Sequence, residues 1–331
     1  MKRLRRTLLV VAALLVLAVA GLTLWLRSES GLSWMLAEAQ RYSNGSLHIG
    51  SHAGALGRPI LLKDLEWQAG PVQVHVDSLR LEWHSMAALL GRAQVSSLAV
   101  DGVQVTLRPG PEAGGGAAKP AFPLVPPAMP HLPLRLVFEE VRIRDIRISA
   151  GPSRPPIQID RLDLAARVDN DSISVRQLQA TGPGVSLEGG MQLAMNRDYA
   201  LDATLDWAYT QPGWAPFRGH TELKGDDRNL TVHQTLAAPY SVTLDGALRD
   251  AFTAPSWRGR VQAARFELAA VHGGWPAYSA DARLDFHGSL AGTTVKGDAG
   301  MRGLPVGAVS GKLDVKLERA ALEIHSLALT L

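Results

Sequence analysis

Residues 74–81 read VHVDSLRL, in which apolar and polar residues alternate up to Val76. Such alternation is typical of a strand that buries one face. It slips by one residue at Asp77-Ser78 and resumes at Leu79. The same slip recurs as LAVDGVQV at 98–105, VRIRDIRI at 141–148 and IQIDRLDL at 157–164. A slip that recurs in several strands indicates a structural device rather than an accident of one strand.

Two local geometries keep the apolar residues on one face across the slip: a two-residue hairpin turn, or a β-bulge inside a longer strand. Asp101-Gly102 suits the hairpin, because glycine accepts positive φ. Asp77-Ser78 and Asp160-Arg161 suit the bulge better. Either geometry predicts a sheet with one apolar face, formed by Val74, Val76, Leu79, Leu81, Leu98, Val100, Val103, Val105, Ile157, Ile159, Leu162 and Leu164.

Short alternating runs divided by Gly, Asp and Asn continue from Leu47 to the end of the chain, which predicts an all-β fold of antiparallel hairpins. Helical spacing occurs in SGLSWMLAEAQRYSNG at 30–45 and in SMAALL at 85–90. Residues rich in Pro, Gly and Ala predict a linker or long loop at 109–133. We therefore expect a basic tail and anchor at 1–27, a helix-plus-strand module at 28–108, this linker, and a repetitive sheet at 134–331 that is truncated within its pattern.

The predicted apolar face has almost no amphipathic helix to cover it. Two arrangements remain open. The sheet folds over into a sandwich with a closed core, or it curls into an elongated open trough whose apolar interior faces something other than protein.

The amino terminus begins with the basic MKRLRR, and the 20 residues at 7–26 carry no charge. Twenty helical residues span about 30 Å, the thickness of a hydrocarbon core. The preceding basic residues predict a single span with a cytoplasmic amino terminus and an exported body. Predicted anchor residues are Leu8, Leu15, Leu22, Trp25 and Leu26. The alternative is a cleaved signal peptide, because Ala18-Val19-Ala20 has the form of a cleavage site.

The composition excludes several classes of function. Among 331 residues there is no cysteine, which excludes disulfides, thiolate metal sites and a cysteine nucleophile. The formal net charge of +3 comes from 34 basic and 31 acidic residues. The amino-terminal Lys2, Arg3, Arg5 and Arg6 supply four of the basic residues, so the remainder balances at 30 against 31. This neutral body lacks the basic surface of a nucleic-acid-binding protein.

No motif for catalysis, a cofactor or a metal emerges. The ten histidines are scattered, and His48 and His52 lie four residues apart in a strand region where that spacing does not place them on one face. Gly288 and Gly292 flank a serine that stands one place too early for a nucleophile elbow. Asp77, Asp101 and Asp160 occupy expected turn positions. We expect no enzyme.

The order of these features resembles the TamB family, within the AsmA-like group of bridge-type lipid-transfer proteins. After the anchor, the resemblance rests on GLSWMLAEAQRY, SLHIGSHAGALGRPILLKDLEWQAGPVQVHVDSLRLEW, ALLGRAQVSSLAVDGVQVTL, LRLVFEEVRIRDIRI, TLDGALRDAFTAPSWRGRVQAARFEL and GGWPAYSADARLDFHGSL, in this order. It covers essentially the whole chain and corresponds to the amino-terminal portion of the family.

The resemblance implies a protein anchored in the inner membrane of a diderm bacterium, with a β-rich body in the periplasm. Phospholipid acyl chains are the expected ligand, and an outer-membrane barrel of the TamA type is the expected partner. The implied function is phospholipid transfer toward the outer membrane, outer-membrane protein assembly, or both.

Two alternatives stay open beside this function. The first is a membrane-tethered periplasmic scaffold with a closed β-sandwich core, which binds proteins through its edge strands. The second is an exported glycan-binding protein, which requires an exposed aromatic stripe, although only 6% of the residues are aromatic.

Overall fold

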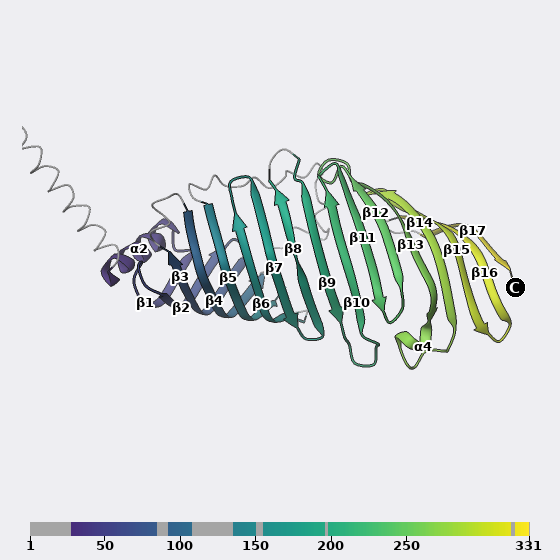
Figure 1. Ribbon diagram of the computed structural model, residues 1–331, viewed down its shortest axis with the longest axis horizontal. Helices are drawn as coiled ribbons and strands as arrows, with labels where there is room; N and C mark the ends of the chain where they lie inside the picture. The colour runs from purple at the N-terminus through teal and green to yellow at the C-terminus, as the bar shows by residue number, and fades with distance from the viewer. Residues whose placement is uncertain are drawn as a thin grey trace, which may run out of the picture. The chain divides into compact units, whose positions relative to one another are not determined.

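The computed structural model describes residues 28–84, 92–107, 135–149, 155–195, 198–318 and 322–330. The described part is mostly strand, as predicted (Figure 1). Its two helices are α2 (Glu29–Tyr42) and the short α4 (Leu268–Val271). The strands are β1 (Leu47–Ala53), β2 (Ile60–Ala69), β3 (Val72–His84), β4 (Arg92–Leu107), β5 (Arg135–Ser149), β6 (Ile157–Val168), β7 (Ser172–Gly182), β8 (Val185–Ala194), β9 (Leu201–Tyr209), β10 (Phe217–Gly225), β11 (Asn229–Ala238), β12 (Val242–Arg249), β13 (Ser256–Glu267), β14 (Ser279–Ser289), β15 (Gly292–Leu304), β16 (Gly307–Glu318) and β17 (Leu322–Thr330).

Helix α2 confirms the helix predicted at 30–45. Ser28 caps its amino terminus, because the Ser28 hydroxyl accepts a hydrogen bond from the backbone N–H of Gly31 at 3.2 Å. Leu32 is 2% exposed. The helix contacts β1, where the Ser33 hydroxyl lies 2.8 Å from Nε2 of His52. The apolar side of α2 therefore packs at the start of the sheet.

Three sequence predictions fall on residues outside the described part. These are the membrane anchor at 7–26, with Leu8, Leu15, Leu22, Trp25 and Leu26, the helical segment at 85–90 and the linker at 109–133. Within the described residues, no helix combines the length and the apolar character needed to cross a bilayer.

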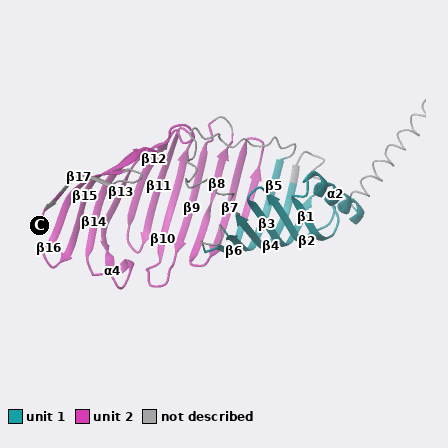
Figure 2. Cartoon of the chain, turned by 180° about the vertical axis from the view of Figure 1, so that it is seen from behind, with its two compact units in different colours: residues 1–113, 133–163 teal, residues 114–132, 164–331 magenta. Residues whose placement is uncertain are grey.

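The chain divides into two compact units (Figure 2). Unit 1 comprises residues 1–113 and 133–163, with α2, β1 to β5 and the first part of β6. Unit 2 comprises residues 114–132 and 164–331, with the rest of β6, β7 to β17 and α4. The four-part division expected from the sequence stays a prediction.

In unit 1, β1 to β4 form a meander in which each strand pairs antiparallel with the next. Strand β5 then pairs with β4 in parallel, with Arg92 opposite Arg135 and Thr106 opposite Ser149. The predicted purely antiparallel sheet is therefore wrong at this pair. A parallel step needs a connection that returns along a whole strand, and residues 108–134 are long enough to supply it.

In unit 2, every strand from β7 to β17 pairs antiparallel with the next along the chain. This meander confirms the predicted succession of hairpins. Both units are open sheets within the described residues. The curling of such a sheet into a trough stays a prediction.

The hairpin turn predicted at Asp101-Gly102 is wrong. Both residues lie inside the 16-residue strand β4. The other three slips also lie within single strands, in β3, β5 and β6. The slip is thus an irregularity inside long strands, as expected for Asp77-Ser78 and Asp160-Arg161.

Loops at one end of the unit 2 strands join through aromatic contacts. Trp214, which precedes β10, forms an isolated bridge with His272, which follows α4. The ring centroids of Trp214 lie 5.4 Å from those of His272 and Trp275. Offset and edge-to-face contacts at this separation are favourable. The contacts tie the loop before β10 to the loop before β14, across the turn between β11 and β12.

Candidate functional site

Apolar side chains of unit 1 form rows that cross the strands. Leu79 of β3 is paired with Leu62 of β2 and with Val100 of β4, and Val100 is paired with Ile143 of β5. Three further rows have the same apolar character, with partners Ile60–Leu81–Leu98–Val141, Leu65–Val76–Val103–Ile146 and Trp67–Val74–Val105–Ile148. The four rows make one continuous apolar face on β2 to β5.

A line of residues without ladder partners separates the row that contains Leu79 from the row that contains Val76. The pairing passes from Lys63–Ser78 directly to Leu65–Val76, so Asp64 and Asp77 each lack a ladder partner. The same omission occurs at the same level in every strand from β1 to β5. We call this line the slip row, and it consists of Gly50, Asp64, Asp77, Gly102 and Asp145.

The residue types of the slip row follow from its backbone geometry. Asp64 and Asp145 both have φ 53°, and Gly102 has φ 70°. Aspartate and glycine are among the few residues that tolerate this left-handed region. A Cβ on Gly102 would lie 1.9 Å from the carboxylate Oδ2 of Asp77. Because each strand takes its extra residue at the same level, the register is preserved and apolar rows continue on both sides.

The slip row explains how an open sheet buries side chains. An extra residue bends its strand, and here five neighbouring strands have one at the same level. Val76 and Val100, on opposite sides of the row, are each only 7% exposed. Ile146 is also 7% exposed and Val141 5% exposed. Side chains of the rows that flank the slip row therefore shield one another.

Eight of the twelve residues predicted for the apolar face come together in these rows. They are the four in β3 and the four in β4: Val74, Val76, Leu79, Leu81, Leu98, Val100, Val103 and Val105. Ile157, Ile159, Leu162 and Leu164 lie in β6, which contributes residues 157–163 to unit 1 and 164–168 to unit 2. Ile157 is 61% exposed.

The sequence prediction missed the contributions of β2 and β5 to this face. They are Ile60, Leu62, Leu65 and Trp67 in β2, and Val141, Ile143, Ile146 and Ile148 in β5. The β5 residues belong to VRIRDIRI, so their slip was visible in the sequence. In β2 the run LLKDLEW has the same slip at Lys63-Asp64, but the adjacent Leu61 and Leu62 hide the alternation.

Unit 2 also has one apolar face, which the predicted residues scarcely touch. Leu244, Val261 and Leu284 are successive partners across β12, β13 and β14. Phe286, Val295 and Val315 continue an adjacent row across β14, β15 and β16. All of these except Val315 are half-buried rather than buried. Among the described residues of unit 2, the four-residue α4 is the only helix, so no helical layer covers this face.

Three aromatic rings of unit 2 lie against glycines of a neighbouring strand. The ring of Trp207 faces Gly219, that of Phe286 faces Gly259, and that of Trp257 faces Gly288. A Cβ on Gly219 would lie 2.4 Å from the Trp207 ring. The indole N–H of Trp257 donates to the Thr293 hydroxyl at 3.2 Å, so its one polar atom is satisfied. Rings that occupy the space of missing side chains are a known way to stabilise glycine-containing strands.

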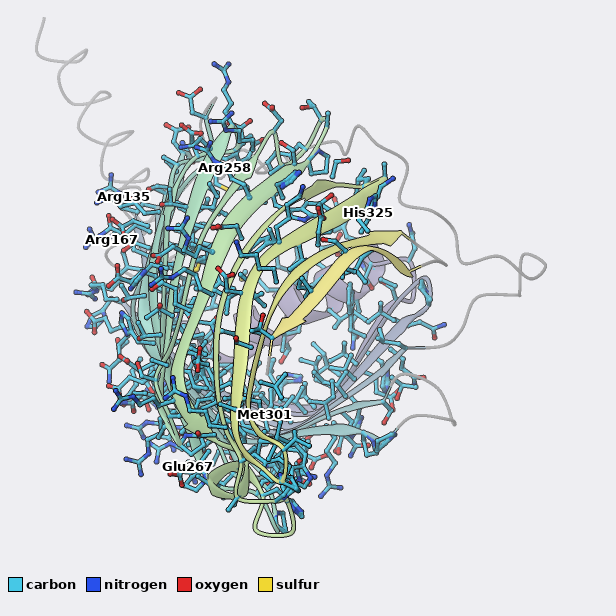
Figure 3. All side chains as sticks on the ribbon, turned by 90° about the vertical axis from the view of Figure 1, so that its right-hand side faces the viewer. Arg135, Arg167, Arg258, Glu267, Met301 and His325 are labelled. Carbon is cyan, nitrogen blue, oxygen red and sulfur yellow. The ribbon has the colours of Figure 1, made fainter. Side chains whose placement is uncertain are left out.

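The opposite face of unit 2 is polar and ion-paired. His233 lies 2.6 Å from Asp245, Arg260 2.6 Å from Asp285, and Lys296 2.9 Å from Asp314. Arg260 donates a hydrogen bond to Asp285 and thereby holds the pKa of that carboxyl below its usual value. In Figure 3 the side chain of Arg167 likewise extends from the outer side of the ribbon. Charges on one face and apolar rows on the other make the unit 2 sheet amphipathic.

A further ion-paired histidine lies on this polar face. Nδ1 of His220 lies 2.7 Å from Asp206, and Nε2 lies 3.2 Å from Glu222. The hydrogen bond to Asp206 raises the pKa of His220, and Glu222 adds to the increase. Within the described residues, no group of three histidines, aspartates or glutamates could hold a metal ion.

Comparisons with known proteins agree with the amphipathic sheet. A family model described as the amino-terminal domain of TamB matches residues 15–121 and 115–331. No curated protein and no solved structure matches the chain. The family match extends over nearly the whole sequence and includes both the slip-row strands and the regular meander. The chain therefore belongs to the TamB family, of which it contains the amino-terminal domain.

Proposed function

We propose that the protein carries phospholipid acyl chains along the apolar face of its sheet, as part of phospholipid transfer toward the outer membrane or of outer-membrane protein assembly. One observation supports this proposal above the others: the apolar rows of unit 2 are half-exposed and lie opposite a polar, ion-paired face. A water-exposed apolar surface of this extent is typical of a binding surface. The role is that of a carrier, without catalysis.

The energetics of an apolar face suit transfer better than storage. Burial of one methylene from water contributes about 0.8 kcal/mol, so an acyl chain gains several kcal/mol on an apolar face relative to water. The same chain is already in an apolar surrounding within a bilayer. Movement from bilayer to protein therefore changes the free energy little. The main effect of the face is to lower the barrier of passing through water.

Family membership supports the proposed location. Members of the TamB family belong to the bacterial envelope. We propose a single amino-terminal span in the inner membrane, a cytoplasmic amino terminus and a periplasmic body, with an outer-membrane barrel of the TamA type as partner. The curled trough belongs to the same proposal, because a curl places the apolar face inside and the ion pairs outside.

Photocrosslinking in the full chain tests the proposal. A photoreactive amino acid replaces Leu79 in unit 1 or Leu284 in unit 2, both half-buried on the apolar face. Matched controls replace the exposed neighbours Arg80 and Arg283, whose side chains lie on the other face. We expect phospholipid adducts at Leu79 and Leu284, and few at the controls, as detected by mass spectrometry after irradiation in membranes.

Adducts only to protein at Leu79 and Leu284 would contradict the proposal. That result would support instead a scaffold with a closed, dry core. Equal lipid labelling on both faces would also contradict it, because it would reflect contact with the membrane rather than an apolar groove.

A further inference from the structure

The polar face of unit 2 contains a charge ladder that runs across six strands. Successive partners in this row are His233, Asp245, Arg260, Asp285, Lys296 and Asp314. Basic and acidic residues alternate, and the ion pairs within the row were given above. Opposite charges on directly opposed strand residues stabilise a sheet. Each charge in this row therefore has a partner of the other sign.

The next row toward the strand ends breaks this balance. Its successive partners are Ala247, Arg258, His287, Thr294, Lys316 and Glu323, so Arg258 has no carboxylate opposite it on either neighbouring strand. Arg249 lies two residues beyond Ala247 on the same face of β12. Within the described residues, neither Arg249 nor Arg258 forms an ion pair. The register partners of Arg249 are Asn229 and Ser256, and those of Arg258 are Ala247 and His287, so neither guanidinium lies opposite a carboxylate.

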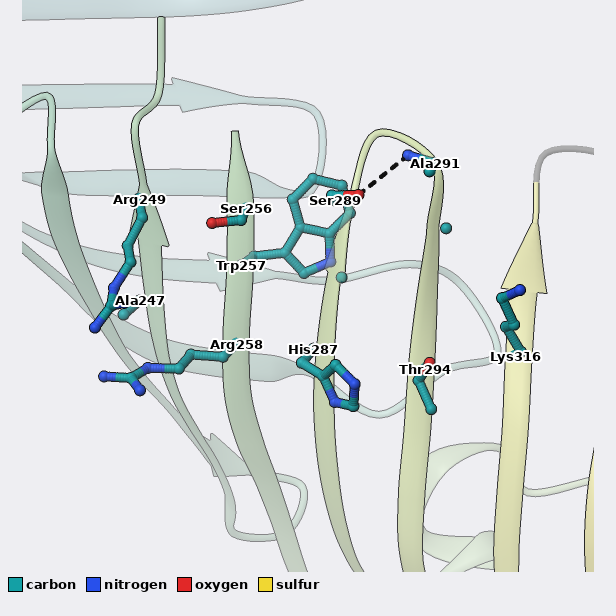
Figure 4. A pocket seen from close by; sticks show the side chains of 12 residues that line it. Ala247, Arg249, Ser256, Trp257, Arg258, His287, Ser289, Ala291, Thr294 and Lys316 are labelled. Carbon is teal, nitrogen blue, oxygen red and sulfur yellow. Dashed lines mark hydrogen bonds between the residues drawn. The ribbon is translucent and has the colours of Figure 1, made fainter. Parts of the chain in front are cut away.

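These residues surround a hollow of about 540 Å³, which we call the rim pocket (Figure 4). Arg258, His287, Thr294 and Lys316 lie in one line across four strands, and Arg249 lies to one side. Ser256 and Ser289 add hydroxyls, and Ser289 already accepts a hydrogen bond from the backbone of Ala291 at 3.3 Å. The volume is in the range of about 300–1,000 Å³ for small-molecule sites.

The rim pocket also reaches the apolar face. Trp257, which lies on that face beside Leu248, lines the pocket next to Gly288. Trp257 and Gly288 lie at the ends of β13 and β14, where the two faces of the sheet meet at its rim. An amphiphile at this place can lay its apolar part along Leu248 and Trp257 and its charged part against Arg249 and Arg258.

A second hollow in unit 2 shows that basic character is not general. This pocket of about 450 Å³ contains Trp207 and Gly219, a ring and glycine arranged like Trp257 and Gly288. It lies at the opposite strand ends, where β9 ends and β10 begins. Its lining includes Glu188 and Asp206 beside Arg218 and His220. The same apolar feature thus occurs with a mixed-charge lining at one edge and a basic lining at the other.

We propose that the rim pocket binds the phosphate of an anionic phospholipid, with Arg249 and Arg258 as its main ligands. This site rests on the proposed function, because the acyl chains of the lipid extend onto the apolar face. A guanidinium donates two parallel hydrogen bonds to a phosphate, and it is more weakly hydrated than an ammonium. His287 and the hydroxyls of Ser256 and Ser289 complete the donor set. The pocket gives the carrier a preference for anionic over zwitterionic headgroups.

Titration calorimetry of the full chain in detergent solution tests the site with three monomeric probes. The probes are dihexanoyl phosphatidylglycerol, dihexanoyl phosphatidylcholine and glycerol 3-phosphate. The test variant is R249Q/R258Q. The matched control R260Q/K296Q removes two positive charges from the same face and one row away, where carboxylates balance them.

For the unmodified chain we expect the anionic lipid to bind more tightly than the zwitterionic lipid. R249Q/R258Q removes charge-assisted hydrogen bonds to the phosphate, so it should weaken binding of the anionic lipid at least about tenfold. Binding of the zwitterionic lipid should weaken less, because its choline cation offsets the attraction of its phosphate to the two guanidinium groups. The control R260Q/K296Q should change the dissociation constants of both lipids by less than about twofold. Equal weakening in both variants would overturn the site, because general attraction would then explain the preference.

The remaining outcomes separate the sources of the phosphate and the two proposals. If glycerol 3-phosphate binds as tightly as the anionic lipid, a free phosphate ester is the ligand and the lipid site is wrong. If both lipids bind equally tightly, the rim pocket does not select anionic headgroups and its assignment is wrong, although the apolar face still holds acyl chains. If neither lipid binds but glycerol 3-phosphate does so through Arg249 and Arg258, the proposed function fails and the anion site alone remains.

Discussion

The two units handle the same problem, an apolar face on an open sheet, in different ways. Unit 1 places an extra residue in five neighbouring strands at one level, the slip row. Unit 2 has separate bulges, in which one strand of a pair has an extra residue and its partner does not, as between Ala263 and Phe266. Each bulge of unit 2 thus concerns one strand pair. Unit 1 has one bulge of this kind, at Ser96 opposite Glu82 and Trp83, but the extra residues of its slip row are coordinated across five strands.

The two units also differ in the size of the apolar side chains that they bury. The buried apolar residues of unit 1 are mostly large: Leu32, Ala55, Ile60, Val76, Val95, Val100, Val141 and Ile146. Those of unit 2 are fewer and mostly alanine: Ala166, Ala180, Val271, Ala280 and Val315. A single sheet shields large side chains only where its strands bend together or a helix covers them. Elsewhere its apolar rows stay accessible, which is what a lipid-carrying face requires.

The largest effect is expected at the slip row. Gly102→Ala should destabilise unit 1 by about 3 kcal/mol, because the new Cβ collides with the Asp77 carboxylate and the residue has φ 70°. Gly70→Ala is the control, since Gly70 has φ 56° but no atom within 4 Å of the new Cβ. The control should cost about 1 kcal/mol. Hydrogen exchange of the β3 and β4 amides measures both; equal costs would show that the slip row has no special packing.

A matched pair of core substitutions measures the difference in burial directly. Val76→Ala removes two methyl groups from a side chain that is 7% exposed and should cost about 2 kcal/mol. Val261→Ala removes the same groups from a half-buried site in unit 2 and should cost less than about 1 kcal/mol. Denaturant unfolding of the full chain, followed in each unit by hydrogen exchange, gives both values. A cost at Val261 as large as that at Val76 would indicate a dry core in unit 2.

The smallest effect concerns the polar face of unit 2. The pKa of His220 is raised in the folded protein, so its contribution to stability is fully present below the unfolded pKa of about 6.5 and is lost as pH rises through the folded value. The side chain is 36% exposed, so we expect a contribution below about 1 kcal/mol. An NMR titration should find the pKa of His220 above its usual value and closer to it in Asp206→Asn. A pKa unchanged by this substitution would remove Asp206 as the main cause.

Much of this organisation could be predicted from the sequence, because alternation and its slip depend on neighbours within one strand. VHVDSLRL identified the strands and the common face, and 30–45 identified α2. The parallel pairing of β4 and β5 could not be predicted, since the partner of a strand after a long connection is not encoded locally. The alignment of Gly50, Asp64, Asp77, Gly102 and Asp145 into one row depends on the registers of four strand pairs.

The rim pocket was also beyond local prediction. Arg249, Arg258, His287 and Lys316 come from four strands spread over 68 residues of sequence, and nothing in one strand marks them as neighbours. Each stands in an ordinary alternating run, where a basic residue on the polar face is unremarkable. Only the registers show that Arg249 and Arg258 lack the acidic register partners that the cations of the adjacent row have.

The slip row constrains how the gene for this protein can change. Loss of one codon at Asp77 would turn residues 74–81 into a regular alternating run, and the extra residues Asp64 and Gly102 of the neighbouring strands would then have no counterpart in β3. A compensating loss would then be needed in each neighbouring strand, so single insertions and deletions within β1 to β5 are selected against together. In unit 2 each bulge concerns one pair, and a whole hairpin can be gained or lost without a change elsewhere. Growth in length is thus easier in the meander than in the strands joined by the slip row.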